Sequence, residues 1–470
     1  MVFFLEKLIF FYSYKIILYT LDMTSFYKFV QIIKKNNKQN VGSYLNTYPQ
    51  AAAKKDYEGR LPLHYAVSNN LNMEVVKMIL DAHPGAAAET DNNGNLPLHY
   101  AAGHNENPEV VKLIYMAYPE AAKVKNKDGN LPLHLAASSN SNLEVVKMIL
   151  DAHPKAATGK DIKGNFPLYH AVLNLNIDVV NMMLDAHPEA ANKKNNFGLF
   201  PLHIAAGHNS NPKVVKLILD AHPEAVAQMN DEDQFPLHYA AGHNSNPKVV
   251  KLILDANPEA ATKKDTNGCP PLHHVATHNK NSEVVKMILD AHPEAAAGKD
   301  IKGNFPLHNV GFNLNLDVVK LILDAHPEAV AQMNDDGQFP LHYAARNNEN
   351  VGVVKLILDA HPKAVVKTDN FSYAPLDFAK YCGSKDVIEV LESALETYMD
   401  SAPKEFICPI TQSIMEDPVV AVDGNTYERA DIVQWFEDHD TSPLTNVKLE
   451  SNNVVPNRAL KSLIDSYMGK

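Results

Sequence analysis

Histidine and cysteine are the residues of this 470-residue chain that could hold a metal ion or act as nucleophiles. There are 22 histidines and three cysteines. A metal site needs three or four ligands that converge on one point, but the histidines recur along the chain in the strings "PLH" and "DAHP". We therefore predict that they are structural, with hydrogen bonds across turns, and that the chain holds no metal or cofactor.

Sulfur gives no better candidate for chemistry. Cys269, Cys382 and Cys408 lie far apart, so cysteines alone build neither a disulfide framework nor a four-cysteine zinc site. Sparse cysteine favours a reducing compartment, and we predict the cytoplasm, with the nucleus as the alternative. Cys408 has no base near it in the sequence, so we predict a small buried apolar residue rather than a nucleophile.

A different set of polar residues stands near the end of the chain. Residues 404–468 contain the only tryptophan and match none of the repeats that precede them. A domain of about 65 residues has a marginal core and often needs a metal or a disulfide bond. With one cysteine this segment can have neither, so we predict that hydrogen bonds and ion pairs hold it together. The candidates for that polar network are Asp423, Glu428, Arg429, Asp431 and Asn457.

The apolar pattern indicates which elements must position these residues. "EFICPIT" (405–411) and "MEDPVVAV" (415–422) alternate toward two short strands, and "VDGN" (422–425) is typical of a hairpin turn. Residues 427–439 predict a helix, and residues 455–468 predict a closing helix. The residues predicted to face inward are Ile432, Trp435 and Phe436 on the first helix and Leu460, Leu463, Ile464 and Tyr467 on the second.

The strings "CPIT", "DPVV", "TYER", "SPLT" and "PN", with the lone tryptophan between them, resemble the U-box, a RING-shaped domain of ubiquitin ligases that lacks zinc. The resemblance implies a ligase without a nucleophile of its own, which grips a ubiquitin-conjugating enzyme carrying ubiquitin as a thioester. It places the contacts at Ile410 in a first loop, Trp435 on a helix and Pro443 in a second loop. These side chains would form a compact apolar patch that anchors a partner. Family members often carry an arginine that bonds both the enzyme and ubiquitin, and Asn446 stands at that position here.

The rest of the chain repeats one theme at intervals of 34 or 35 residues, marked by ten prolines from Pro62 to Pro375. A fixed period of this length indicates a stacked solenoid. Each repeat predicts two helices: the first begins at the proline, and the second begins after an asparagine that can cap it, as at Asn211. "HPEA" should end the second helix because proline cannot continue the backbone ladder, and a "DxxG" turn follows.

These repeats resemble ankyrin repeats, whose signature includes Thr-Pro-Leu-His-x-Ala. Leucine or phenylalanine replaces that threonine here, as at Leu96 and Phe166, which removes a capping hydroxyl at a cost of about 1 kcal/mol. We expect the packing of the extra apolar side chain between repeats to offset this cost. The predicted fold is mainly α, an ankyrin-repeat α-solenoid followed by a small α+β U-box domain. The predicted domains are an N-terminal apolar segment or cap (1–40), the array of about ten repeats after a partial one (41–399) and the U-box (400–470).

Residues 2–21 are apolar, but Glu6, Lys7 and Lys15 interrupt them. A membrane-spanning helix needs about 20 mostly apolar residues, and no small-residue cleavage site for a signal peptide follows. Three interpretations stay open: a membrane or secretory segment, a cap over the first repeat, or a start assigned ahead of Met23. We expect no membrane role.

The net charge of −12 limits the partners. It repels phosphate backbones, so nucleic acid is a poor candidate. Turn tips such as "DNNGN" and "NDEDQ" are polar and somewhat acidic, which favours a basic or amide-bonding protein on the concave face of the array, although simple solvated turns have the same composition.

The two resemblances together imply a ubiquitin ligase whose array recruits a protein substrate and whose U-box brings a loaded conjugating enzyme to it. One alternative is a scaffold with an inactive U-box that sequesters partners. Another is a ligase tethered to a membrane by residues 2–21.

Overall fold

A computed structural model describes residues 24–69, 72–382 and 385–468. The interpretations of residues 2–21 therefore fall outside the described residues. In the part of the chain that the structure describes, no helix is both long and apolar enough to cross a membrane. The chain divides into two compact units, one with residues up to 240 and 248–260, and the other with residues 241–247 and those from 261 onward.

Each of the ten prolines begins a first helix, as predicted, and we number the repeats 1 to 10 from Pro62 to Pro375. Proline suits this place because its missing N–H would have no partner there. The asparagine caps are also confirmed: the side-chain oxygen of Asn107 accepts from the backbone N–H of Glu109 at 3.1 Å. "HPEA" ends the α-helix and then begins a 3-10 helix, as at Pro223–Ala227.

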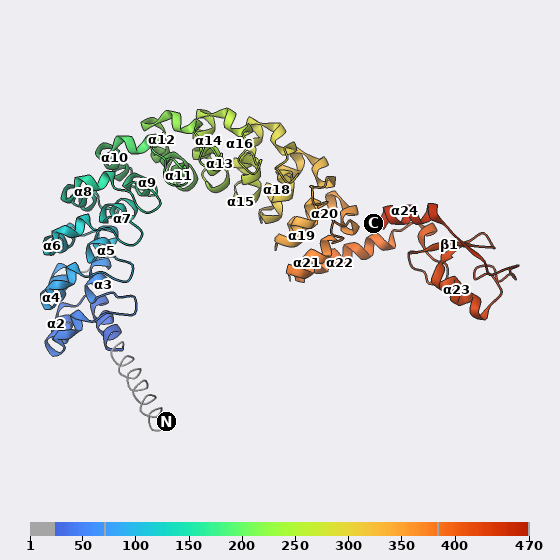
Figure 1. The fold of residues 1–470 in the computed structure, drawn as a ribbon, viewed down its shortest axis with the longest axis horizontal. Coiled ribbons are helices and arrows are strands. Elements are labelled where there is room, and N and C mark those ends of the chain that lie inside the picture. Colours follow the sequence, from blue (N-terminus) through green and yellow to red (C-terminus); the bar gives the residue numbers. More distant parts are fainter. Residues whose placement is uncertain (1–23, 70–71, 383–384, 469–470) are drawn as a thin grey trace, which may run out of the picture. The chain divides into compact units, whose positions relative to one another are not determined.

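In the first unit the first helices of the repeats lie in one layer and the second helices in another (Figure 1). Residues 24–34 are helical and precede α2 (Lys38–Thr47). The first helices are α3 (Pro62–Ser68), α5 (Pro97–His104), α7 (Pro132–Ser139), α9 (Pro167–Ala171) and α11 (Pro201–His208). The second helices are α4 (Met73–Ala82), α6 (Pro108–Ala117), α8 (Leu143–Ala152), α10 (Ile177–Ala186) and α12 (Pro212–Ala221). The 3-10 helices are η1 (Pro49–Ala53), η2 (Pro84–Ala88), η3 (Pro119–Lys123), η4 (Pro154–Thr158), η5 (Pro188–Asn192) and η6 (Pro223–Ala227).

The division between the units falls within repeat 6, whose elements are α13 (Pro236–His243), α14 (Pro247–Ala256) and η7 (Pro258–Thr262). In the second unit the first helices are α15 (Pro271–His278), α17 (Pro306–Asn309) with η9 (Val310–Phe312), α19 (Pro340–Asn347) and α21 (Pro375–Cys382). The second helices are α16 (Ser282–Ala291), α18 (Leu316–Ala325), α20 (Val351–Ala360) and α22 (Lys385–Asp400), and the 3-10 helices between repeats are η8 (Pro293–Ala297), η10 (Pro327–Ala331) and η11 (Pro362–Val366).

The core of the array lies between the two helix layers and between neighbouring repeats. On α12, Val214, Val215 and Ile218 are at most 1% exposed. In eight repeats the residue before the proline is a leucine or phenylalanine, and it is buried as expected: Leu96 is 2% exposed and Phe166 is 6% exposed. Burial of a large apolar side chain contributes about 1.5–3 kcal/mol, which is more than the lost capping hydroxyl costs.

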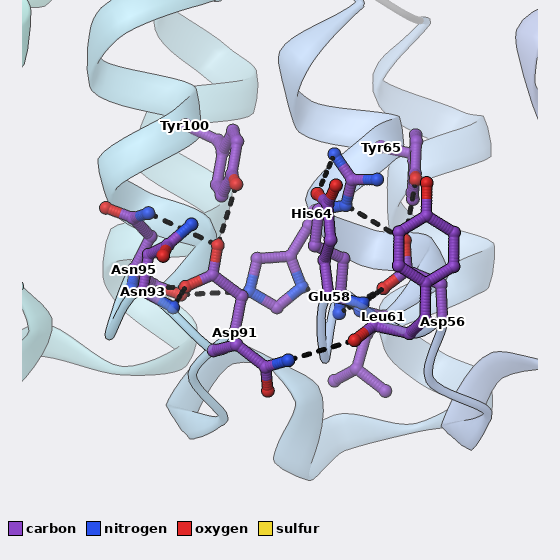
Figure 2. A network of polar contacts seen from close by, with 12 residues as sticks. Asp56, Glu58, Leu61, His64, Tyr65, Asp91, Asn93, Asn95 and Tyr100 are labelled. Carbon is purple, nitrogen blue, oxygen red and sulfur yellow. Dashed lines mark hydrogen bonds and ion pairs between the residues drawn. The ribbon is translucent and has the colours of Figure 1, made fainter.

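The "PLH" histidines join adjacent repeats, which confirms their structural role. His64 accepts at Nδ1 from the backbone N–H of Leu61 (3.0 Å) and donates from Nε2 to the carbonyl oxygen of Asn95 in the next repeat (3.1 Å). Figure 2 shows His64 between the turn residues Asp56 and Asp91. The neutral ring satisfies both partners, and burial lowers the pKa of the equivalent histidine in most repeats.

A row of buried asparagines after the first helices also connects the repeats. Asn140 donates from Nδ2 to the carbonyl oxygens of Ala102 (2.9 Å) and Asn105 (2.8 Å), and its Oδ1 accepts from the N–H of Asn142 (2.9 Å). Other asparagines with the same contact to the preceding repeat are Asn105, Asn174, Asn209, Asn279, Asn313 and Asn348. The sequence analysis did not predict this row.

The C-terminal domain contains η12 (Lys404–Phe406), α23 (Arg429–Asp438), α24 (Arg458–Met468) and an antiparallel sheet of order β2–β1–β3. The strands are β1 (Pro418–Ala421), β2 (Thr426–Glu428) and β3 (Val454–Pro456). The predicted hairpin turn joins β1 to β2, with Val420 opposite both Thr426 and Val455. Gly424 in this turn has φ +79°, a conformation that glycine adopts without strain.

Three predictions for this domain are wrong. The closing helix was predicted to begin at residue 455, but residues 454–456 form β3 and the helix begins at Arg458. Residues 405–411 do not form a strand; only an isolated bridge joins Ile407 to Ile414, since Pro409 has no N–H for a ladder. Leu463 was predicted to face inward but is 59% exposed, because Ile464 fills the core position and is 2% exposed.

The last helix of the array contacts the closing helix of the C-terminal domain. The rings of Tyr398 on α22 and Tyr467 on α24 stack with centroids 4.7 Å apart. The Tyr467 hydroxyl donates to the Tyr398 carbonyl oxygen (2.7 Å), and the Tyr398 hydroxyl donates to the Tyr467 carbonyl oxygen (3.2 Å). The domain is therefore bonded to repeat 10.

Candidate functional site

The predicted site is built on α23, which holds a loop on each side. The first loop, residues 408–414, precedes the sheet, and the second loop, residues 441–447, follows the helix. Asp431 and Trp435 lie four residues apart on α23, so their side chains share one face of the helix. Asp431 bonds the first loop and Trp435 bonds the second.

The first loop is fixed by the carboxylate of Asp431. Its Oδ2 accepts from the hydroxyl of Thr411 (2.8 Å) and lies 3.3 Å from Sγ of Cys408. Cys408 is fully buried, as predicted, and its sulfur also accepts from the backbone N–H of Glu428 (3.4 Å). Ile410 is half-buried beside these bonded residues and packs against the domain core. Part of the Ile410 side chain is thus exposed to solvent.

The second loop is fixed by the indole ring of Trp435. Nε1 donates to the carbonyl oxygen of Thr441 (2.8 Å), and the ring stacks on His439 with centroids 4.0 Å apart. Ser442 is buried, and its Oγ accepts from the N–H groups of Leu444 (3.2 Å) and Thr445 (3.1 Å). Pro443, half-buried, stands between these bonded residues.

Asn446 closes the second loop. It has φ +55°, in the left-handed region where asparagine is enriched among residues other than glycine. Its backbone N–H donates to the carbonyl oxygen of Ser442 (2.9 Å), and its side chain is exposed. The side chain is therefore available to a partner bound to this loop.

The five residues predicted as a polar network do not form one cluster. Asp431 belongs to the first loop. Glu428 accepts at Oε2 from the N–H groups of Glu416 (2.6 Å) and Asp417 (2.9 Å), and Arg429 Nε pairs with Asp417 Oδ2 (2.7 Å). These bonds join the start of α23 to the segment before β1.

The other two predicted polar residues hold the sheet. Asn457 donates from Nδ2 to the hydroxyl of Thr426 (3.2 Å), and its Oδ1 accepts from the N–H of Leu460, which caps α24. Asp423 accepts at Oδ2 from the hydroxyl of Tyr427 (2.7 Å). Partial burial would raise the pKa of Asp423, but hydrogen bonds from Ser442, Asn425 and Tyr427 outweigh it and lower the pKa. Asp423 thereby connects the hairpin turn to the second loop.

Sequence reasoning missed several groups that shape this site. Thr411, Thr441 and Ser442 supply the bonds that fix the loops, and only the serine before "PLT" carries a recognisable turn signal. Leu444 and Val447 are 53% and 62% exposed and add apolar surface to the second loop. Within the residues that the structure describes, no group of three or more His, Cys, Asp or Glu side chains is arranged to hold a metal ion.

Fold and site together define a class of protein: a solenoid of helical repeats that ends in a small α+β domain with two fixed loops around one helix. The family model for ankyrin repeats matches residues 29–398 in five overlapping stretches, and the model for the U-box domain matches residues 402–470. The chain therefore belongs to the ankyrin-repeat proteins, and it carries a C-terminal U-box domain. This confirms the predicted architecture.

Curated relatives match the U-box region. The chain is 51% identical over 67 residues to the putative U-box domain-containing protein 55 of Arabidopsis thaliana. The matched region covers 14% of this chain and 12% of that protein. The chain is 54% identical over 67 residues to U-box domain-containing protein 36 of Arabidopsis thaliana, covering 14% and 15%. It is 51% identical over 73 residues to the probable bifunctional E2/E3 enzyme R795 of Acanthamoeba polyphaga mimivirus, covering 15% and 6%. The chain thus spans a small part of each of these relatives.

Proposed function

We propose that this protein is a ubiquitin ligase of the RING/U-box type. The U-box binds a conjugating enzyme that carries ubiquitin as a thioester, and the ankyrin array recruits a protein substrate. A substrate lysine amine attacks the thioester carbonyl, an isopeptide bond forms, and the thiol of the conjugating enzyme leaves. The ligase forms no covalent intermediate, so its contribution is orientation and electrostatics.

One observation carries this proposal: α23 fastens both loops through two side chains one turn apart, Asp431 to Thr411 and Trp435 to Thr441. A docking surface whose loops are held in place loses less conformational entropy when a partner binds. The proposed contacts are Ile410, Trp435 and Pro443. All three are half-buried, so one part of each side chain is held by the domain and the other part is exposed to a partner.

The second candidate function is a scaffold that binds partners without promoting transfer. Asn446 favours it, because the side chain is shorter than the arginine common in the family and carries no charge. Under this alternative the conjugating enzyme binds but the thioester reacts no faster.

A single-turnover discharge assay separates the two functions. A conjugating enzyme charged with ubiquitin is mixed with free lysine, with and without the full-length protein, and loss of the thioester is followed on gels. We expect the protein to raise the rate and Ile410→Ala to remove most of the gain, about tenfold, because the substitution removes an apolar anchor. Leu463→Ala is the matched control, since this exposed leucine lies on α24 and belongs to neither loop.

Equal rates with and without the wild-type protein, together with measurable binding of the conjugating enzyme, would support the scaffold. Loss of activity in Leu463→Ala as large as in Ile410→Ala would contradict the assignment of the contact patch.

A further inference from the structure

The turn tips of consecutive repeats form a continuous row held by backbone hydrogen bonds. In the first unit the N–H of Lys127 donates to the carbonyl oxygen of Asn93, that of Ile162 to Asp128, and that of Asn196 to Lys163, each at 2.9 Å. In the tips that lead into repeats 2, 4 and 5 an Asp or Asn side chain also accepts from two backbone N–H groups, as Asp91 does in Figure 2, and in the tip that leads into repeat 3 Asn126 accepts from one. The tips are thus rigid neighbours, and side chains on adjacent tips form one surface.

Three neighbouring tips differ in charge from the rest of this acidic chain. Segments 125–128, 160–163 and 194–197, which lead into repeats 3, 4 and 5, we call the basic tip surface. It carries five lysines against two aspartates, and all five lysines are exposed: Lys125, Lys127, Lys160, Lys163 and Lys194. One aspartate is engaged within its own repeat, because Asp161 Oδ2 lies 3.1 Å from Nε2 of His170 on α9. The surface therefore attracts anions.

Some of these ammonium groups are held in place. Lys125 Nζ donates to the carbonyl oxygen of Lys160 (2.6 Å). Lys160 and Lys194 lie over the rings of Phe166 and Phe200, at 4.9 and 5.5 Å from the ring centroids. Ordered charges cost a partner less entropy to engage than freely moving ones.

Two large apolar side chains stand among the lysines. Ile162 is 61% exposed and Phe197 is 55% exposed. They lie on adjacent tips, which the side chain of Asn196 joins by donating to the Ile162 carbonyl oxygen (3.0 Å). Single exposed apolar residues are common, but a pair on rigid, neighbouring tips offers contacts that a purely charged ligand would leave unused.

The basic tip surface is short. The tip that leads into repeat 6 holds Asp231, Glu232 and Asp233, and the N–H of Asp231 donates to the Phe197 carbonyl oxygen (3.4 Å). A long polyanion that extends past repeat 5 would meet these acids on a chain of net charge −12. A short acidic ligand would not.

We propose that the basic tip surface binds an acidic segment of a partner protein that places apolar side chains against Ile162 and Phe197. This inference rests on the recruiting role proposed for the array and names the chemistry of what is recruited. It differs from the basic partner that the sequence analysis expected, because that expectation came from tips such as "DNNGN" and "NDEDQ".

The chain contains a matched control for this proposal. The string "GKDIKGNFPL" occurs at 159–168 and again at 298–307, so Ile301 and Lys302 repeat Ile162 and Lys163. Ile301 is 65% exposed, but the next tip holds Asp335 and Asp336, and the N–H of Asp335 donates to the Lys302 carbonyl oxygen (3.0 Å). The corresponding segments, 264–267, 299–302 and 333–336, carry three lysines against four aspartates. Ile301 and Lys302 therefore match Ile162 and Lys163 but are not surrounded by an excess of lysines.

The test is fluorescence anisotropy with the full-length protein and a labelled acidic peptide that contains one leucine and one phenylalanine. About 12 residues suffice, since an extended chain spans roughly 3.3 Å per residue. Three comparison probes are used: the same peptide with alanine for both apolar residues, a peptide with lysine for the acidic residues, and a single-stranded oligonucleotide of similar length. We expect the first peptide to bind at least about tenfold more tightly than any of the others.

The variants locate the site. We expect Ile162→Ser with Phe197→Ser, and separately Lys127→Glu with Lys163→Glu, to weaken binding about tenfold, and Ile301→Ser and Lys302→Glu to stay within about twofold of wild type. Equal binding of the alanine peptide or the oligonucleotide overturns the proposal, as does a loss of binding in Ile301→Ser as large as in the variant with both Ile162→Ser and Phe197→Ser. The discharge assay is independent of this test. If discharge is normal but the peptide does not bind, only the proposal for the basic tip surface is rejected. If the peptide binds but discharge is not accelerated, only the proposed ligase function is rejected.

Discussion

The indole N–H of Trp435 donates to the carbonyl oxygen of Thr441 at 2.8 Å, and this bond joins the helix of the U-box to its second loop. Trp435 thus has two roles in the proposed site. In the proposed function its ring offers apolar surface to the conjugating enzyme, and its N–H bond to Thr441 sets the position of the loop that carries Pro443. A buried or half-buried tryptophan usually satisfies its N–H in this way.

Trp435→Phe separates the two roles, because phenylalanine keeps an aromatic face but cannot donate. We expect lower affinity for the conjugating enzyme, by about tenfold, and a loss of roughly 1 kcal/mol in domain stability, the usual net value of one hydrogen bond. Affinity is measured by calorimetry and stability by urea unfolding. His439→Ala is the control, since it removes the stacked ring and leaves the indole bond intact. Wild-type affinity in Trp435→Phe would show that the bond does not position the loop.

Thr411→Val tests the hydrogen bond that joins the first loop to Asp431 on α23. Valine keeps the shape of threonine but removes the hydroxyl that donates to Asp431 Oδ2 at 2.8 Å. We expect the first loop to lose its fixed position and the discharge rate to fall about three- to tenfold, because the ends of the contact patch are no longer held together. Ser413→Ala, in the same exposed loop, removes a hydroxyl with a weaker bond of 3.4 Å and should leave the rate nearly unchanged. Equal rates for both variants would contradict this role of Asp431.

The repeat architecture was predictable because period, proline and asparagine caps are local signals, and each repeat displays them again. Local signals do not indicate which group in the next repeat a side chain will bond. The histidine of "PLH" was assigned to a structural role, yet its bond from His64 to Asn95 crosses 31 residues. The asparagine row went unpredicted for the same reason.

In the U-box site, too, local signals were predictive and contacts between distant residues were not. Ile410, Trp435 and Pro443 were predicted from a motif, and the inward helix face with Ile432 was predicted from spacing. The pairing of Thr411 with Asp431 joins residues 20 apart through tertiary structure, and no periodicity announces it. Leu463 was wrongly placed inward because helical spacing alone cannot choose between two adjacent apolar residues when the core is small.

Repeat 7 contains a mismatch that a substitution can correct. In seven other repeats the Leu or Phe before the proline donates its N–H to histidine Nδ1, as Phe305 does to His308 at 3.2 Å. Repeat 7 has Pro270 at this place, which has no N–H, and Nδ1 of the buried His273 has no hydrogen-bond partner among the described residues. A buried polar atom without a partner costs about 1–3 kcal/mol.

We expect Pro270→Leu to stabilise the chain by about 1 kcal/mol, because the regained bond outweighs the roughly 0.4–1 kcal/mol lost when the unfolded chain becomes more flexible. Pro270 has φ −74° and ψ 167°, close to the values of Leu131 at the same place in repeat 3, so leucine fits the backbone. Urea unfolding at neutral pH measures the change. Pro270→Ala restores the N–H without the larger side chain and separates hydrogen bonding from packing. If neither variant is more stable than wild type, the unpaired nitrogen is not a source of instability.

The buried histidines predict loss of stability in acid. Burial lowers the pKa of His99, His134, His203, His273, His308 and His342 to about 4. An unfolded histidine titrates near pH 6.5, so between these values the unfolded chain binds more protons than the folded one. Stability is therefore full above about pH 6.5 and falls as the pH drops toward 4, by up to about 3 kcal/mol for each histidine.

Urea midpoints followed by circular dichroism between about pH 7 and pH 4 measure this fall. His342→Gln is the informative variant, because glutamine can accept from Phe339 and donate to Tyr373 but does not titrate. We expect it to be less stable than wild type at neutral pH and to lose less stability on acidification. An unchanged pH dependence in His342→Gln would exclude this histidine as a source of acid sensitivity.

Asn446 offers a test of how strongly the proposed ligase promotes ubiquitin transfer. Its side chain is exposed at the end of the second loop, in the position where the family often has an arginine that bonds both the conjugating enzyme and ubiquitin. We expect Asn446→Arg to raise the single-turnover discharge rate about three- to tenfold, because the guanidinium supplies several fixed donors at once. The φ of +55° disfavours arginine slightly relative to asparagine, which limits the gain. Asn446→Lys adds the same charge without the planar donor fork, and we expect it to recover only part of the increase. A discharge rate for Asn446→Arg no higher than wild type would mean that this loop does not reach ubiquitin, and would shift the balance toward the scaffold function.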